Sequence, residues 1–176
     1  TMSWYFNEER IYYYFHGIIE YPLGTKQYSV RIDEKHFILS VKDLSLANGG
    51  TYTCSTTMDK SSANLLVLGE PSIILKPAVI VENDTAVLRC EAQFGELPKN
   101  QLPVDDIPFL RIFYADNPIQ ELPAVDKTDP EGNIFIKEYT TTAHWQMHRR
   151  KLGCGFDTDN AALNISSFAT LNIKYA

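Results

Sequence analysis

Four histidines, at positions 16, 36, 144 and 148, are the side chains of this chain best suited to acid–base or metal chemistry. No serine or cysteine nucleophile stands beside them in the pattern that nucleophilic catalysis requires. His144 and His148 could share a face, but no third metal ligand is evident, and an exposed polar pair is the simpler interpretation. The chain is therefore predicted not to be an enzyme, and neither a cofactor nor a metal is expected.

The charged stretches of the chain likewise do not indicate a ligand site. The carboxylates of 105–106 and of 157 and 159 lack the ligand spacing of a calcium loop, so we interpret them as solvated turns. The basic run 149–151 is more typical of a solvated strand entrance than of an anion site. We expect no small-molecule substrate at these stretches.

Composition limits the class of partner. The net charge is −6, from 22 acidic and 16 basic residues, which gives no electrostatic reason to bind nucleic acid or an anionic membrane. An apolar content of 44% in 176 residues can fill the cores of two domains of about 100 residues if one is incomplete. No apolar run approaches the roughly 20 residues of a membrane-spanning helix. The expected partner is another protein.

Cysteines and glycosylation sequons indicate the compartment. The chain has 3 cysteines and two sequons, which begin at Asn83 and Asn164. Together they favour an oxidising, secretory environment, with glycans at both asparagines. We therefore expect an extracellular protein, either on the cell surface or secreted.

The stretch from Asn48 to Cys54, Asn-Gly-Gly-Thr-Tyr-Thr-Cys, carries the most specific motif of the chain. A tyrosine two residues before a cysteine, just after a tight turn, resembles the tyrosine corner of immunoglobulin domains. The resemblance implies that the Tyr52 hydroxyl bonds to backbone across the corner and that Cys54 points inward between two sheets. Asn48 departs from the family pattern, which has an aspartate at that position.

The residues around this corner fit a V-type immunoglobulin domain over residues 1–69. Trp4 matches the buried tryptophan of strand C, and the aromatic run 11–15 reads as strand C′. The other expected strands are 27–32 (D), 36–41 (E), 51–57 (F) and 63–68 (G). The strand B cysteine of the family would have to precede Trp4, so the resemblance predicts a domain that lacks its N-terminal strands in this sequence, with Cys54 unpaired.

After a short linker at 69–71, residues 70–176 resemble a C2- or I-type immunoglobulin domain. Its expected strands are A around Ile73 and Leu75, B at 87–90, C at 109–119, E at 134–142, F at 151–156 and G at 169–175. The resemblance implies a disulfide between Cys90 and Cys154 and places Phe113 in the position of the family's tryptophan. The fold class is therefore predicted to be all-β, with two tandem immunoglobulin-like sandwiches.

An aromatic face is the predicted binding surface. If Trp4 points into the core, alternation places Tyr5 outward, and the same reasoning for strand F leaves alternate hydroxyl residues outward. Tyr12 and Tyr14 share this face if Ile11 faces the core; otherwise these aromatics simply cover it. The predicted protein-binding residues are Tyr5, Tyr12, Tyr14, Thr53, Ser55 and Met58.

The predicted function is cell-surface adhesion or recognition, through binding of another cell-surface or secreted protein, possibly a second copy of the chain itself. A secreted two-domain protein that acts as a soluble ligand or decoy is the alternative. An antigen receptor is disfavoured because 65–69 lacks the Phe-Gly-x-Gly bulge. Residues 144–154 and the Trp4–Tyr14 aromatics further resemble nectin-like and Beaten-path-type receptors.

Overall fold

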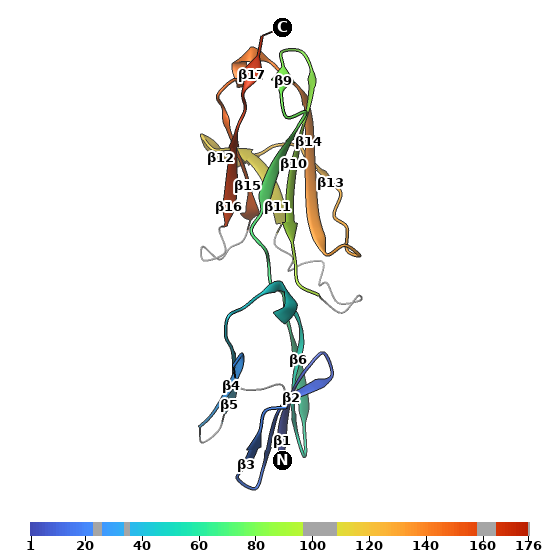
Figure 1. The fold of residues 1–176 in the computed structure, drawn as a ribbon, viewed down its shortest axis with the longest axis vertical. Coiled ribbons are helices and arrows are strands. Elements are labelled where there is room, and N and C mark those ends of the chain that lie inside the picture. Colours follow the sequence, from blue (N-terminus) through green and yellow to red (C-terminus); the bar gives the residue numbers. More distant parts are fainter. Residues whose placement is uncertain (23–25, 34–35, 97–108, 158–164, 176) are drawn as a thin grey trace. The chain divides into compact units, whose positions relative to one another are not determined.

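The structure, a computed structural model, describes residues 1–22, 26–33, 36–96, 109–157 and 165–175. The chain divides into two compact units. The first contains Thr1–Val67 together with Gly95 and Glu96, and the second contains Leu68–Phe94 and the described residues from Phe109 onward. The described sheets are antiparallel except for one short parallel pair in the second unit, and the described helices are single turns, so the predicted all-β fold class is confirmed (Figure 1). The boundary between residues 69 and 70 remains a prediction.

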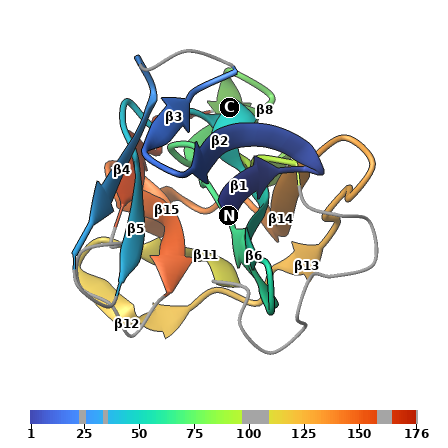
Figure 2. The ribbon, with the colours of Figure 1, turned by 90° about the horizontal axis from the view of Figure 1, so that it is seen from below.

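The first unit has a sheet of five strands in the order β3-β2-β1-β6-β7. A separate antiparallel pair, β4 with β5, carries the other strands of this unit (Figure 2). The strands are β1 (Met2–Phe6), β2 (Glu9–Phe15), β3 (Ile18–Glu20), β4 (Tyr28–Ile32), β5 (Phe37–Val41), β6 (Gly50–Thr56) and β7 (Lys60–Leu65). The core of the unit is built from Ile11, Tyr28 and Tyr52, against which Trp4, Phe6, Leu39, Val41 and Leu65 pack.

The predicted tyrosine corner is confirmed. A turn of 3-10 helix, η1 (Leu46–Asn48), leads into β6, and the Tyr52 hydroxyl donates to the carbonyl of Asn48 at 3.0 Å. The Asn48 side chain accepts the backbone N–H of Ser45 at 2.7 Å, so the amide that replaces the family's aspartate holds the turn itself. Burial raises the pKa of Tyr52 to about 12, because the phenolate would be poorly solvated there.

The second unit contains two four-stranded sheets, in the orders β13-β14-β10-β8 and β12-β11-β15-β16, and a short parallel pair, β17 with β9. Its elements are β8 (Ser72–Lys76), β9 (Ile80–Val81), β10 (Thr85–Gln93), β11 (Phe109–Tyr114), β12 (Asn117–Glu121), β13 (Val125–Asp126), β14 (Ile134–Thr142), η2 (Trp145–Met147), β15 (Lys151–Asp157), β16 (Ser166–Thr170) and β17 (Ile173–Lys174). The predicted disulfide joins Cys90 of β10 to Cys154 of β15 and so links the two sheets.

Several of the predicted strands have different bounds, and the expected strand at 87–90 extends over Thr85–Gln93, as β10. The expected strand at 63–68 begins earlier, as β7, while 109–119 is divided into β11 and β12 by a turn. The expected strand at 169–175 is likewise divided between β16 and β17, because the chain leaves one sheet and pairs with β9. Bends of this kind depend on which strand the chain pairs with next, so they cannot be predicted from the local alternation of apolar and polar residues.

The predicted role of Phe113 is wrong by one residue. Ile112, not Phe113, lies opposite Cys154, and it is completely buried. Phe113 lies opposite Gly153 on the other face of the sheet, where a Cβ at Gly153 would come within 2.4 Å of the phenyl ring. The glycine lets the ring lie flat against the strand, which buries an aromatic side chain on an outward face.

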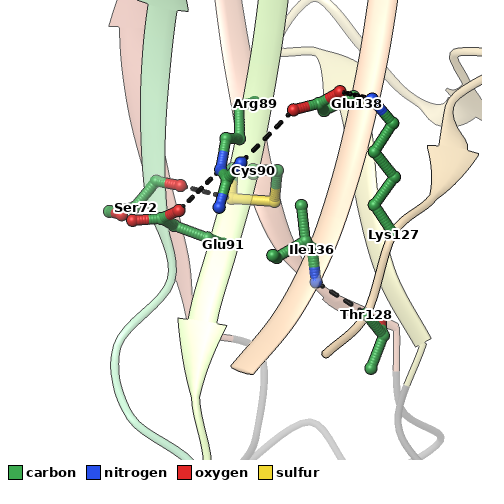
Figure 3. Close-up of polar contacts among 9 residues, drawn as sticks. Ser72, Arg89, Cys90, Glu91, Lys127, Thr128, Ile136 and Glu138 are labelled. Carbon is green, nitrogen blue, oxygen red and sulfur yellow. Dashed lines mark hydrogen bonds and ion pairs between the residues drawn. A yellow bond between two sulfur atoms is a disulfide. The ribbon is translucent and has the colours of Figure 1, made fainter. Parts of the chain in front are cut away.

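A charged cluster stabilises the β10–β14 sheet on its outer face (Figure 3). The Arg89 guanidinium donates to Glu91 at 2.8 Å and to Glu138 of β14 at 3.4 Å. Lys127 also pairs with Glu138, and the lysine, followed by Arg89, holds the pKa of Glu138 below its ordinary value.

In the described part of the chain, no helix has the length and apolar character needed to cross a membrane.

Candidate protein-binding surface

A β-bulge in the five-stranded sheet determines which aromatic side chains face outward. Trp4 of β1 pairs with Tyr12 of β2, whereas the next residue, Tyr5, pairs with Arg10. Ile11 is therefore the extra residue of β2 at this point. Because a bulge interrupts alternation, Ile11 and Tyr12 can both turn toward the core, and both are buried.

The expected outward placement of Tyr12 and Tyr14 is wrong. Tyr12 is 1% exposed, and its ring centroid lies 5.1 Å from that of Tyr21. It shares the face of Trp4, which packs against the core, and Tyr14 lies opposite buried Met2 on that same face. Desolvation raises the pKa of Tyr12, whose hydroxyl has no hydrogen-bond partner among the described residues. The bulge has shifted the alternation of inward and outward side chains in β2 by one residue.

The outer face of β2 instead carries a row of stacked groups. The Arg10 guanidinium lies 4.9 Å from the centre of the Tyr13 ring, and Tyr13 stacks on Phe15 with centroids 6.4 Å apart. His16 contacts Phe15 edge-to-face at 4.2 Å. Phe15 is 40% exposed, and Ile18, opposite it on β3, is 57% exposed. Large side chains thus remain open to solvent along one sheet edge.

Three of the predicted binding residues lie on this same outer face. Tyr5 lies opposite Thr53 in β6, and Ser55 lies opposite Ser3 two residues further along the sheet. Thr53 is buried, and its hydroxyl bonds with that of Ser62 at 2.8 Å, so it offers little contact area. Met58 is 92% exposed in the turn between β6 and β7. The structure therefore brings Tyr5, Thr53 and Ser55 together on one face.

Sequence reasoning missed Arg10, Tyr13, Phe15 and Ile18. Phe15 and Ile18 could have been found from the His16-Gly17 pair between them, which favours a tight hairpin turn. In the structure these two turn residues have φ values of +48° and +85° and join β2 to β3. Nothing in the local sequence marks the bulge at Ile11. Without it, strict alternation assigns Tyr13 to the core.

The histidines and the basic run considered as possible metal or anion ligands make structural contacts instead. His148 stacks on Trp145 with centroids 4.6 Å apart, and its Nδ1 accepts the backbone N–H of Ile173 at 3.1 Å. Arg150 of the basic run lies over the Tyr114 ring and pairs with Asp116 at 3.0 Å. Within the described residues, no three His, Cys, Asp or Glu side chains gather as metal ligands would.

Of the two predicted glycosylation residues, Asn83 and Asn164, the structure describes only Asn83. Asn83 lies on an exposed turn after β9, in the left-handed conformation with a φ of +70°. A turn of this kind presents its side chain to solvent, as an acceptor asparagine requires. Asn164 lies outside the described residues. Both glycosylation sites remain predictions.

Comparisons with known proteins agree with the fold. No family model matches the chain. Human slow-type myosin-binding protein C is 26% identical over 178 residues, a match that covers 94% of this chain but only 15% of that protein. Among solved structures, the Ig1–Ig3 ectodomain of mouse nectin-like molecule 4 has a TM-score of 0.59 at 14% identity, covering 99% of this chain and 59% of that one. Rst D1–D2 has a TM-score of 0.50 at 11% identity, covering 99% and 85%.

These findings define the class of the protein by its architecture. It is an all-β chain of two tandem immunoglobulin-like sandwiches, one linked by a disulfide and the other held by a tyrosine corner. Similarity at 14% and 11% identity shows the fold alone. Function has to be argued from the surface that the fold presents.

Proposed function

We propose that the chain is a recognition module of a cell-surface adhesion or recognition receptor and that it binds another protein through the outer face of its five-stranded sheet. The observation that carries the proposal is the row formed by Tyr5, Arg10, Tyr13, Phe15 and Ile18, called here the aromatic face. Its residues come from β1, β2 and β3, and Arg10, Phe15 and Ile18 are exposed.

The chemistry of this face suits a protein partner. Tyrosine and phenylalanine bury a large area while losing little side-chain entropy, and arginine is enriched in the energetic centres of interfaces. Glu20 lies opposite Tyr13, so the aromatic rings have a charged neighbour at the rim. A standard interface on this face would bury ~800 Å² of it, with one or two of the aromatic side chains dominating the energy.

An extracellular location is part of the proposal. The Cys90–Cys154 disulfide supports it, because such bonds persist in oxidising compartments. The exposed sequon at Asn83 supports it as well. The nectin-like or Beaten-path-type subfamily, indicated by the stretches around Trp4 and 144–154, belongs to the same proposal.

Two neighbouring isoleucines of β3 provide a matched test. Ile18 lies opposite Phe15 on the aromatic face, whereas Ile19 lies opposite Tyr14 on the other face. Their exposed fractions are almost equal, 57% and 53%. The glycosylated chain, displayed as a tetramer, would first be used to screen an array of extracellular protein domains. Ile18→Ser should then weaken binding to a hit by about tenfold or more, and Ile19→Ser should leave it unchanged. Equal effects of the two substitutions would contradict the proposal.

A further inference from the structure

Three aromatic rings stack at one end of the second unit. Trp145 of η2 stacks on His148 and on Tyr175, with ring centroids 4.6 Å and 4.4 Å apart. His148 is half-buried, whereas Trp145 and Tyr175 are 42% and 65% exposed. The stack is tied to the fold, because His148 Nδ1 accepts the backbone N–H of Ile173 at 3.1 Å. Two flat rings are therefore held in place while part of their surface stays open to solvent.

The sequon at Asn83 lies next to this stack. β9 pairs with β17 at this end of the second unit (Figure 1), and the turn that follows β9 contains Asn83. Asn83 N–H donates to the carbonyl of Ala143 at 2.8 Å, two residues before the tryptophan. Glu82 N–H donates to the carbonyl of Lys174 at 2.9 Å, one residue before the tyrosine. The sequon turn thus contacts the backbone of both segments that carry the exposed rings.

The turn presents its sequon to solvent. Asp84 N–H donates to the Val81 carbonyl at 3.1 Å, which closes the turn with Asn83 in the left-handed conformation. The three residues of the sequon, from Asn83 to Thr85, are all exposed. The acceptor amide and the threonine hydroxyl are therefore accessible for glycosylation.

We propose that the N-glycan attached to Asn83 packs its first N-acetylglucosamine on the exposed surface of Trp145 and Tyr175. This inference rests on the extracellular location proposed above, because N-glycosylation occurs in the secretory pathway. A pyranose ring has C–H groups on its face and hydroxyl groups around its edge, so it can cover an aromatic ring while its hydroxyls stay hydrated. The glycan thereby covers aromatic surface that would otherwise face water.

Polar side chains beside the stack suit the rest of the glycan. Trp145 and His148 line an open hollow of about 480 Å³ together with Gln146 and Arg149. The glutamine amide and the arginine guanidinium are hydrogen-bond donors, and sugar hydroxyls can accept from both. An aromatic ring beside such donors offers a sugar both of the contacts that it can make.

Comparing chains with and without the glycan tests this contact. Thr85→Ala removes the sequon but keeps Asn83, whose φ of +70° most other residues adopt only at a cost. Thr85→Ser keeps the sequon and is the matched control. Every chain would also carry Asn164→Gln, so that Asn83 has the one remaining sequon. An endoglycosidase would trim the glycan to its first sugar.

In calorimetry of the full chain, the trimmed glycan should raise the Tm of the second unit by about 2–4 °C over the Thr85→Ala chain. Trp145→Leu, which keeps apolar bulk without a flat ring, should abolish this difference, and so should Tyr175→Ser. Phe168→Ser should leave the difference unchanged, because Phe168 is 46% exposed but lies opposite Gly153 on the outer face of another sheet.

Ring currents give a readout that does not depend on stability. In NMR spectra, the acetyl methyl group of the first sugar should be shifted from its position in a free glycopeptide, and Trp145→Leu or Tyr175→Ser should return it there. An unshifted methyl on a glycosylated chain would overturn this inference and leave the proposed binding function untouched. A secreted chain without a glycan on Asn83 would overturn it and also remove one support of the extracellular location. Dimerisation through Tyr175 that ignores the glycan would assign the rings to a second copy and overturn it too.

Discussion

Removing one buried hydroxyl should make the first unit more stable. Tyr12 is 1% exposed, and its hydroxyl has no hydrogen-bond partner in the described part of the chain. A buried polar group without a partner costs about 1–3 kcal/mol of desolvation. Tyr12→Phe removes that cost and keeps the ring contact with Tyr21 at 5.1 Å. We expect the free energy of unfolding to rise by ~1 kcal/mol, which corresponds to an increase in Tm of about 4–8 °C for a domain of this size.

Tyr52→Phe is the matched control. The Tyr52 hydroxyl donates to the Asn48 carbonyl at 3.0 Å, so the same chemical change there removes a hydrogen bond. It should lower the free energy of unfolding by about 1 kcal/mol. One substitution thus stabilises the unit and the other destabilises it, although both delete a single tyrosine oxygen from the core.

The two tryptophans make the assay specific for the first unit. Trp4 lies in β1, and Trp145, which is half-exposed, lies in the second unit. With Trp145→Phe as the background, Trp4 fluorescence follows unfolding of the first unit in denaturant. A loss of ~1 kcal/mol or more for Tyr12→Phe would show that the hydroxyl has a partner and would refute the inward assignment of Tyr12. No change in stability would also refute it, because an outward hydroxyl is already solvated.

Two further outcomes follow from the second unit. Because Lys127 lowers the pKa of Glu138, the stabilisation by this carboxylate is present above its ordinary pKa of 4.5 and is lost as the pH falls through the lowered value. The difference in Tm between the wild type and Glu138→Gln should therefore be larger at neutral pH than in acid, whereas exposed Glu131→Gln should show no such difference. Gly153→Ala should destabilise the unit by about 1–3 kcal/mol in denaturant unfolding, because its Cβ would meet the Phe113 ring. Combining it with Phe113→Ala should cost less than the sum of the two single changes, and additive effects would contradict the contact.

Local sequence patterns predicted the strands well where apolar residues alternate along one uninterrupted strand. β4, β5 and β14 fall close to their expected bounds, since alternation of apolar residues depends only on one buried face. The corner at Tyr52 and the Cys90–Cys154 bond followed from motifs with fixed geometry.

The face of a strand was harder to predict than its position. The bulge at Ile11 moved Tyr12 into the core and Tyr13 out of it, and a one-residue offset exchanged the roles of Ile112 and Phe113. Both errors arise because the phase of a strand is set by its neighbour across the sheet. Gly153, which accommodates Phe113 on the outer face, was visible in the sequence, but its partner was not.

The central claim is that the aromatic face binds a protein partner, and adjacent tyrosines of β2 test it most directly. Tyr13 stacks on Phe15 on that face, while Tyr14 lies opposite Met2 on the core face. The measurement is the affinity of Tyr13→Ala and Tyr14→Ala for an extracellular domain identified in the screen, together with the Tm of each variant. Tyr13→Ala should weaken binding by ~2 kcal/mol with little change in Tm, and Tyr14→Ala should lower Tm while the folded protein still binds. Weaker binding with Tyr14→Ala and none of this loss with Tyr13→Ala would contradict the account.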